Sequence, residues 1–198
     1  MMGDMPPTQN EKGADFRALH DGDPFVIPNP WDAGSAKVLA GLGFKALAST
    51  SSGFAYTLGR PDGAATLDEV VEHAGALDRA TSLPVSVDLE NGYGPTAQDV
   101  ARAVARVAGA GAVGASIEDC DPSEGIYPLD DAAERVAAAV EASQREGEAG
   151  AGGCQGLESE ARQDLGRAGV PRVGNDERLS LVERTESRCL LILHLPRS

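Results

Sequence analysis

Four short apolar segments in this sequence each precede a longer segment whose apolar residues recur at helical spacing. The short segments cover residues 25–28, 46–50, 84–90 and 112–119, and the longer ones cover residues 35–42, 67–80, 96–108 and 129–142. Alternation of strand and helix is typical of a parallel sheet, because each strand must be reached through a crossover helix. The order of elements therefore predicts an α/β domain with a parallel sheet.

Two of the predicted strands separate apolar from polar residues, since side chains alternate faces along a strand. Val85, Val87 and Leu89 share one face, whereas Asp88 and Glu90 share the other. The strand at 112–119 repeats this alternation, and its second face holds small or acidic residues: Gly114, Ser116 and Glu118. In a barrel, the apolar face packs under the helices and the acids reach the carboxyl rim, where the chemistry takes place. An open doubly wound sheet also places ligands at strand ends, so both architectures stay open at this point.

Three acidic residues, Asp88, Glu90 and Glu118, end neighbouring predicted strands on the same face. Adjacent strands lie about 4.8 Å apart, so two such carboxylates cannot both stay ionised without a nearby cation. Mg²⁺ prefers oxygen ligands and retains several waters, so one or two direct carboxylates can hold it, and Mn²⁺ accepts similar ligands. The pattern predicts a divalent metal site. The alternative is a set of solvated acids or caps of the following helices.

Two loops indicate where a substrate could bind. Residues 49–54 combine small polar side chains with a glycine at a strand end, where hydroxyls and amides can bind a carboxylate or phosphate oxygen. Their order matches no nucleotide-binding loop, and an ordinary turn is the alternative. Residues 59–63, Gly-Arg-Pro-Asp-Gly, predict a turn or a mobile lid that carries Asp62.

The composition excludes several classes of partner and site. The net charge of −14 opposes binding to nucleic acid and to anionic membranes. The three cysteines lack the spacing of a zinc site or a disulfide framework, and no signal-peptide core or membrane-length apolar run is present. These features predict a soluble protein of the reducing cytoplasm.

The sequence divides into three predicted regions. Residues 1–13 form a polar leader that we expect to be disordered, and residues 14–145 hold the four strand and helix units. Residues 146–198 are rich in Gly, Arg and Glu and contain one strand-length apolar run, at residues 189–195. This composition predicts a tail that is disordered or read in a shifted frame. The alternatives are a natural extension and an open domain that the tail completes.

Four segments together resemble the phosphoenolpyruvate mutase and isocitrate lyase superfamily in their order and spacing. They are PNPWDAGSA at 28–36, LGRPD at 58–62, DLENGYG at 88–94 and IED at 117–119. The resemblance extends over residues 16–142 and points to a carboxyvinyl-carboxyphosphonate phosphorylmutase-like member. It implies a (βα) TIM barrel of which about the first half is present, followed by a tail without counterpart in the superfamily.

The resemblance also implies roles for individual residues. It implies Mg²⁺ ligands at Asp88, Glu90 and Glu118. It implies that the substrate carboxylate contacts Thr50, Ser51 and Ser52. It implies catalytic roles for Asp62 on a gating loop, Asp88 and Glu118. The implied substrates are small 2-oxocarboxylates, their adducts or phosphonates, whose C–C or C–P bonds break beside an enolate, and members are usually homo-oligomers.

Two departures from the superfamily pattern bear on activity. Its lyases carry a Lys-Lys/Arg-Cys-Gly-His loop after strand four, whereas Cys120 here comes too early and has no basic neighbours. The arginine that strand five supplies to the substrate has no counterpart in VGNDER at 173–178. The leading hypothesis is a Mg²⁺-dependent lyase or phosphonomutase-like enzyme. The alternative is a catalytically inactive truncated fragment that self-associates or binds a partner.

Overall fold

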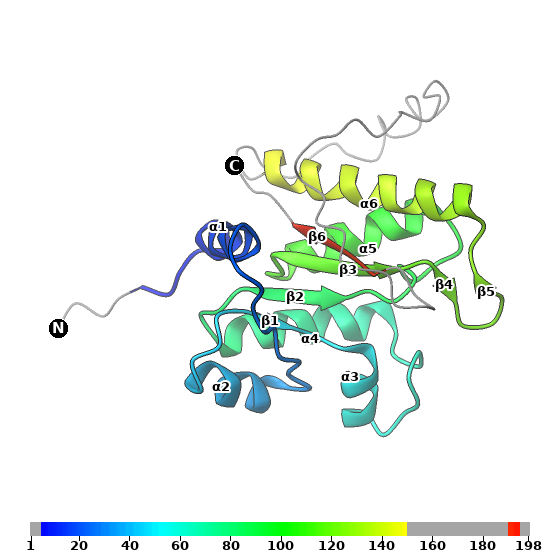
Figure 1. The fold of residues 1–198 in the computed structure, drawn as a ribbon. Helices are drawn as coiled ribbons and strands as arrows, with labels where there is room; N and C mark the ends of the chain where they lie inside the picture. The colour runs from blue at the N-terminus through cyan, green and yellow to red at the C-terminus, as the bar shows by residue number, and fades with distance from the viewer. Residues whose placement is uncertain (1–4, 150–189, 195–198) are drawn as a thin grey trace.

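The fold is built around one sheet whose first three strands run parallel (Figure 1). The computed structural model describes residues 5–149 and 190–194. The sheet has the order β1-β2-β3-β6, with these bounds: β1 Leu47–Ala48, β2 Val85–Asp88, β3 Gly114–Glu118 and β6 Leu190–His194. The predicted α/β class with parallel strands is confirmed, and the last strand, β6, pairs antiparallel with β3.

Helices precede and connect these strands. Their bounds are α1 Gln9–His20, α2 Ala33–Gly41, α3 Ser51–Thr57, α4 Leu67–Ala80, α5 Ala97–Gly109 and α6 Leu129–Ala149. The bounds of α4 agree with the predicted 67–80, since a reciprocal capping box between Thr66 and Glu69 fixes its start. α5 and α6 pack against each other along the sheet (Figure 1). None of the described helices is long and apolar enough to cross a membrane.

The core lies between the sheet and the helices, as the alternation along the strands predicts. Val85, Val87 and Leu89 are fully buried and belong to one apolar cluster with the inward residues of α5. Those residues recur at helical spacing: Val100, Val104 and Val107. Burial of this face leaves the alternate residues of β2 and β3 on the opposite side of the sheet, where Asp88 and Glu118 stand.

The segment at 25–28 is not a strand, which corrects the sequence prediction. It runs beside β1, and its backbone contact is a hydrogen bond of 3.2 Å from the Ala48 N–H to the Pro28 carbonyl. Pro24 precedes the segment and Pro28 is its last residue, and proline has no N–H to donate to a strand ladder. Local chemistry therefore prevents a regular strand although the segment is apolar.

Two further elements were not predicted from the sequence. α3 forms in the small-residue stretch that was expected to be a loop, and a short hairpin forms after β3. The hairpin consists of β4 Cys120–Asp121 and β5 Gly125–Ile126. The Asp121 carboxylate accepts hydrogen bonds from the Ser123 and Glu124 amides, which stabilises the turn between the two strands.

The predicted boundaries at both ends of the barrel region need correction. Residues 9–13, expected within a disordered leader, begin α1, where Thr8 and Glu11 form a capping box. The predicted boundary at 145 falls inside α6, and residues 190–194 of the predicted tail form β6. The remaining tail residues, 150–189 and 195–198, lie outside the described residues, as do residues 1–4.

His73 of α4 is a buried titratable residue in the helical layer. Its ring stacks on Phe54 with 4.0 Å between ring centroids, and its Nε2 atom has no hydrogen-bond partner. Burial lowers the pKa of His73 to about 4, against an opposing attraction from Asp32. The imidazole is therefore neutral in the folded protein at pH 7 and serves as a packed ring rather than as a base.

We expect the substitution His73→Phe to remove an acid-sensitive part of the stability. Because the pKa of His73 is lower in the folded chain than in the unfolded chain, the unfolded chain binds this proton first. The free energy of unfolding should therefore fall as the pH drops from 6.5 toward about 4. The loss is on the order of 2 kcal/mol. Urea unfolding of both proteins at pH 7 and pH 4.5 measures it, and an equal pH dependence in both would contradict the assignment.

Candidate active site

The carboxyl ends of β2 and β3 bring the predicted acids together. Asp88 is the last residue of β2, Glu118 is the last residue of β3, and Glu90 follows β2 by two residues. The pairing continues past the strands, since the Glu118 N–H donates to the Glu90 carbonyl at 2.7 Å. The register of the sheet therefore fixes the spacing of these residues along one edge.

Asp88 is held in place by the chain around it. Its Oδ2 atom accepts a hydrogen bond of 2.9 Å from the Ser51 N–H, and its Oδ1 atom accepts one of 3.0 Å from the Glu90 N–H. Its own N–H donates to the Ser49 hydroxyl at 2.9 Å. The Asp88 carboxylate thus connects the predicted metal ligands to the predicted substrate loop.

The predicted substrate loop lies at the start of α3. Thr50 is the N-cap of this helix, and its side chain makes no capping hydrogen bond. The Ser51 N–H is engaged by Asp88, whereas the Ser52 side chain is exposed. The geometry therefore places the loop beside the acids and leaves the Thr50 hydroxyl outside the helix-capping role that Thr66 and Thr96 fill elsewhere.

Asp88, Glu90 and Glu118 form an acidic edge at the carboxyl ends of β2 and β3, and the pKa of Glu90 within it is raised. Burial raises the pKa of its carboxyl, and the negative charges of Asp88, Asp62 and Glu118 raise it further. The Tyr93 hydroxyl opposes this shift by donating a hydrogen bond of 2.7 Å to Glu90 Oε1. Burial raises the pKa of Tyr93 in turn, so its hydroxyl stays protonated and remains a donor at neutral pH. These acids therefore share one electrostatic environment.

Asp62 lies on an exposed turn next to Glu90. A Cβ placed on Gly63 would lie 3.7 Å from Glu90 Oε2, so this turn lies in close contact with the Glu90 side chain. The Arg60 guanidinium anchors the turn to α4 through hydrogen bonds of 2.9 Å to both Glu69 carboxylate oxygens. The predicted lid is thus attached to α4 through Arg60. The negative charge of its Asp62 carboxylate is close enough to raise the pKa of Glu90.

The acids fit a hydrated divalent cation better than a closed metal cage. Within residues 5–149 and 190–194, no three His, Cys, Asp or Glu side chains lie close enough together to hold a metal ion directly. Asp88 already accepts two amide hydrogen bonds, and Glu90 accepts one from Tyr93. A cation that keeps most of its waters needs only one or two direct carboxylates, and the accumulated negative charge favours it.

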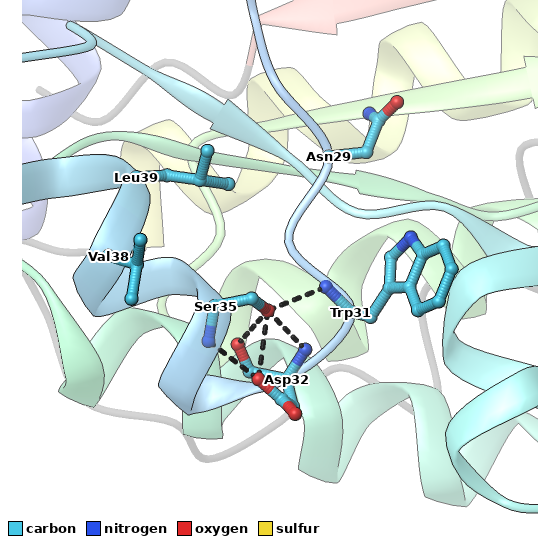
Figure 2. Close-up of a pocket in the computed structure, with 6 residues that line it drawn as sticks. All are labelled: Asn29, Trp31, Asp32, Ser35, Val38 and Leu39. Carbon is cyan, nitrogen blue, oxygen red and sulfur yellow. Dashed lines mark hydrogen bonds between the residues drawn. The ribbon is translucent and has the colours of Figure 1, made fainter. Parts of the chain in front are cut away.

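A separate hollow of about 380 Å³ lies beside the start of α2 (Figure 2). Its lining residues are Asn29, Trp31, Asp32, Ser35, Val38 and Leu39. Its acidic and hydroxyl side chains form a capping box, in which the Ser35 N–H donates to Asp32 Oδ1 at 2.7 Å. Trp31 packs against α3, because a Cβ on Gly53 would lie 2.3 Å from Trp31 Cδ1. Asp32 and Ser35 therefore serve the start of the helix, Asn29 Nδ2 donates to the Ala48 carbonyl of β1, and none of the predicted ligands line the hollow.

Tyr93 is a residue of the edge that the sequence reasoning did not assign. The signal that could have identified it is the Gly92-Tyr93-Gly94 run, because a tyrosine between glycines directly after an acidic strand end indicates a tight turn. Tyr93 adopts a φ of 59° and Gly92 a φ of 88°, both in the left-handed region. This turn folds the Tyr93 hydroxyl back onto Glu90.

Comparisons with known proteins show which proteins this chain is similar to. Residues 16–149 match the phosphoenolpyruvate phosphomutase family. The chain is 34% identical to oxaloacetate decarboxylase of Chromohalobacter salexigens, covering 69% of this chain and 50% of the relative. It is 35% identical to 2-methylisocitrate lyase of Escherichia coli, covering 66% of this chain and 48% of the relative. The chain therefore spans about half the length of these curated relatives.

Solved structures agree with the sequence relatives. A crystal structure from Burkholderia cenocepacia J2315 superposes with a TM-score of 0.68 at 48% identity, covering 69% of this chain and 50% of that chain. Oxaloacetate acetylhydrolase, solved in complex with the product oxalate, superposes with a TM-score of 0.64 at 28% identity, covering 70% of this chain and 50% of that chain. The described fold is thus the first part of a TIM barrel of the phosphoenolpyruvate mutase and isocitrate lyase superfamily, as predicted.

The packing of Trp31 on α3 predicts that Gly53→Ala disturbs the substrate loop. The new methyl group would lie 2.3 Å from Trp31 Cδ1 and 2.7 Å from Thr50 Cγ2, so both side chains must move. We expect a loss of about 1–3 kcal/mol in the free energy of unfolding. Gly41→Ala on α2 is the matched control, because its methyl group meets no atom within 4 Å. Urea unfolding compares the two variants, and equal stabilities would contradict the close contact.

Proposed function

This chain belongs to the phosphoenolpyruvate phosphomutase family, and we propose on that basis that its acidic edge binds a divalent cation together with a small 2-oxocarboxylate. Mg²⁺ suits the oxygen ligands, and Mn²⁺ is the alternative ion. The observation that carries the proposal is the placement of Asp88, Glu90 and Glu118 at the carboxyl ends of two paired strands, where the negative charges of the neighbouring acids repel that of Glu90. A cation at this edge would relieve that repulsion.

The proposed reaction is cleavage of a carbon–carbon bond beside the 2-oxo group. The name of one relative, oxaloacetate decarboxylase, supports this class, and the name of a second, 2-methylisocitrate lyase, supports lyase chemistry more generally. The bonding electrons move onto the oxo oxygen to form an enolate as the leaving group departs, and a proton then adds to the remaining carbon. When bound, the cation supplies stabilisation of the negative charge that develops on that oxygen. Cleavage of a C–P bond is the related alternative, since it develops the same enolate charge.

The residues of this chain divide between the cation and the substrate in the proposal. Asp88 and Glu118 hold the cation directly or through water, and Glu90 completes the negative edge with its position fixed by Tyr93. The substrate carboxylate contacts the loop at the start of α3: Thr50, Ser51 and Ser52. Asp62 on its turn covers the substrate from the solvent side and excludes water.

Decarboxylation fits the hairpin after β3 better than chemistry that needs a cysteine acid. The Cys120 thiol donates to the Asp121 carbonyl at 3.6 Å, so it is directed into its own hairpin. The described chain offers no Lys-Cys-Gly-His sequence after β3. When CO₂ is the leaving group, the cleavage step itself needs no proton donor, and water can later supply the proton.

A second candidate function is binding without turnover. Two observations favour it: the chain spans about half the length of its curated relatives, and β6 covers the edge of β3 in the antiparallel direction. A complete (βα)₈ barrel uses parallel strands throughout and builds its site from eight loops. Such a chain would bind the cation, associate with itself or a partner, and catalyse no reaction.

We expect Mg²⁺ to raise the midpoint of thermal unfolding, because a ligand that binds only the folded state stabilises it by mass action. Asp88→Asn and Glu118→Gln should each reduce this response at least several-fold. Glu72→Gln, an exposed acid on α4, is the control and should retain it. A midpoint that does not respond to Mg²⁺ in the unsubstituted protein would contradict the proposed site.

Turnover is tested on the same proteins with oxaloacetate, 2-methylisocitrate and phosphonopyruvate, by following product formation with and without a chelator. Release of CO₂ from oxaloacetate that stops on chelation supports decarboxylation. A Mg²⁺ response without turnover of any of these compounds favours the binding-only candidate, and sedimentation then measures whether the chain associates.

A further inference from the structure

The turn from Glu90 to Gly94 adopts a conformation that its residues do not favour by themselves. Glu90 has a φ of 48° and Tyr93 a φ of 59°, so two residues with side chains occupy the left-handed region. Such conformations persist only where surrounding contacts hold them. The direction of the Glu90 side chain depends on this turn, and the contacts that hold it therefore matter to the acidic edge.

Arg135 of α6 makes the contacts that span this turn. It is 4% exposed, and its Nη2 atom donates to the Asn91 and Gly94 carbonyls, the second at 2.8 Å. One guanidinium nitrogen thus binds two carbonyls, one that precedes Gly92 in the chain and one that follows it. The Tyr127 ring lies 4.4 Å from the guanidinium carbon, which fixes the plane of the group.

Asn91 is fixed from the side of the hairpin as well. Its Nδ2 atom donates to the Tyr127 hydroxyl at 2.9 Å, and its Oδ1 atom accepts from the Tyr93 N–H at 3.2 Å. The contacts therefore run without interruption from Arg135 and Tyr127, through Asn91, to Tyr93 and finally to Glu90. Neither Arg135 nor Tyr127 was part of the predicted site.

We propose that Arg135 is a positioning residue for Glu90: it holds the 90–94 turn in the left-handed form that keeps the Glu90 carboxylate among the other acids. The inference rests on the proposed function, since it assigns a purpose to Glu90 at the cation site. Arg135 acts through the backbone and touches neither cation nor substrate. Its charge alone is not sufficient, because the nitrogen that makes both carbonyl contacts belongs to a planar group whose position is set by packing on the Tyr127 ring.

The test compares Arg135→Met and Arg135→Lys with Arg145→Met, which removes an exposed cation from the same helix. Isothermal titration measures Mg²⁺ affinity, and hydrogen exchange measures protection of the Gly92 and Tyr93 amides. We expect both Arg135 variants to bind Mg²⁺ about tenfold to a hundredfold more weakly, the size typical for outer contacts of metal ligands. Both amides should exchange faster, because their hydrogen bonds to Leu89 and Asn91 depend on the turn. Arg145→Met should change neither quantity.

The two measurements separate this inference from the proposed function. If the unsubstituted protein fails to bind Mg²⁺, the proposed function fails, and amide exchange alone decides whether Arg135 holds the turn. A folded Arg135→Met protein with unchanged exchange at both amides overturns the inference, as does faster exchange that extends equally to the Val87 amide in β2. If Arg135→Met does not fold, Arg135→Lys decides the question, because it keeps the buried positive charge but loses the planar group that packs on Tyr127. Unchanged exchange of both amides in that variant also overturns the inference.

Discussion

Like charges at the carboxyl ends of β2 and β3 are the constraint on which the site depends, because backbone pairing brings them together regardless of their charge. The buried face of β2 fixes the strand against α5, and the Leu89 N–H donates to the Ser116 carbonyl at 3.1 Å just beyond it. Asp88 and Glu118 therefore cannot separate without breaking the sheet. Burial raises the pKa of Glu90, and the repulsion from the neighbouring acids raises it further; a bound cation would relieve both effects.

The turn after β2 holds Glu90 and Tyr93 in left-handed backbone conformations. A left-handed conformation costs about 1–3 kcal/mol for each residue other than glycine. A hydrogen bond to a charged donor contributes about 1.5–3 kcal/mol. The two hydrogen bonds that Arg135 donates are therefore large enough to offset the conformational cost at Glu90 and Tyr93. The position of Glu90, just after β2, is thus stabilised by Arg135 of α6, which lies 44 residues beyond Asn91 in the chain.

The sequence predicted those features that depend on local chemistry. Alternation along β2 and β3 placed Asp88 and Glu118 on one face, and the capping box at Thr66 fixed the start of α4. Two of the missed features are long-range: Arg135 contacts the 91–94 turn across the fold, and β6 pairs with β3 across a long stretch of chain. The predicted strand at 25–28 failed for a local reason, since the prolines before it and at its end lack the donors that a ladder requires.

The edge of β3 decides how much of a barrel this chain can form by itself. An exposed parallel edge would pair with another chain, and β6 covers it in the antiparallel direction. That pairing satisfies the backbone of β3, but it occupies the position at which a barrel would continue with a parallel strand. The acidic edge needs only β2, β3 and the turn that Arg135 holds, whereas enclosure of a substrate needs loops from further strands. Cation binding and catalysis are therefore physically separable in this chain, and the first does not imply the second.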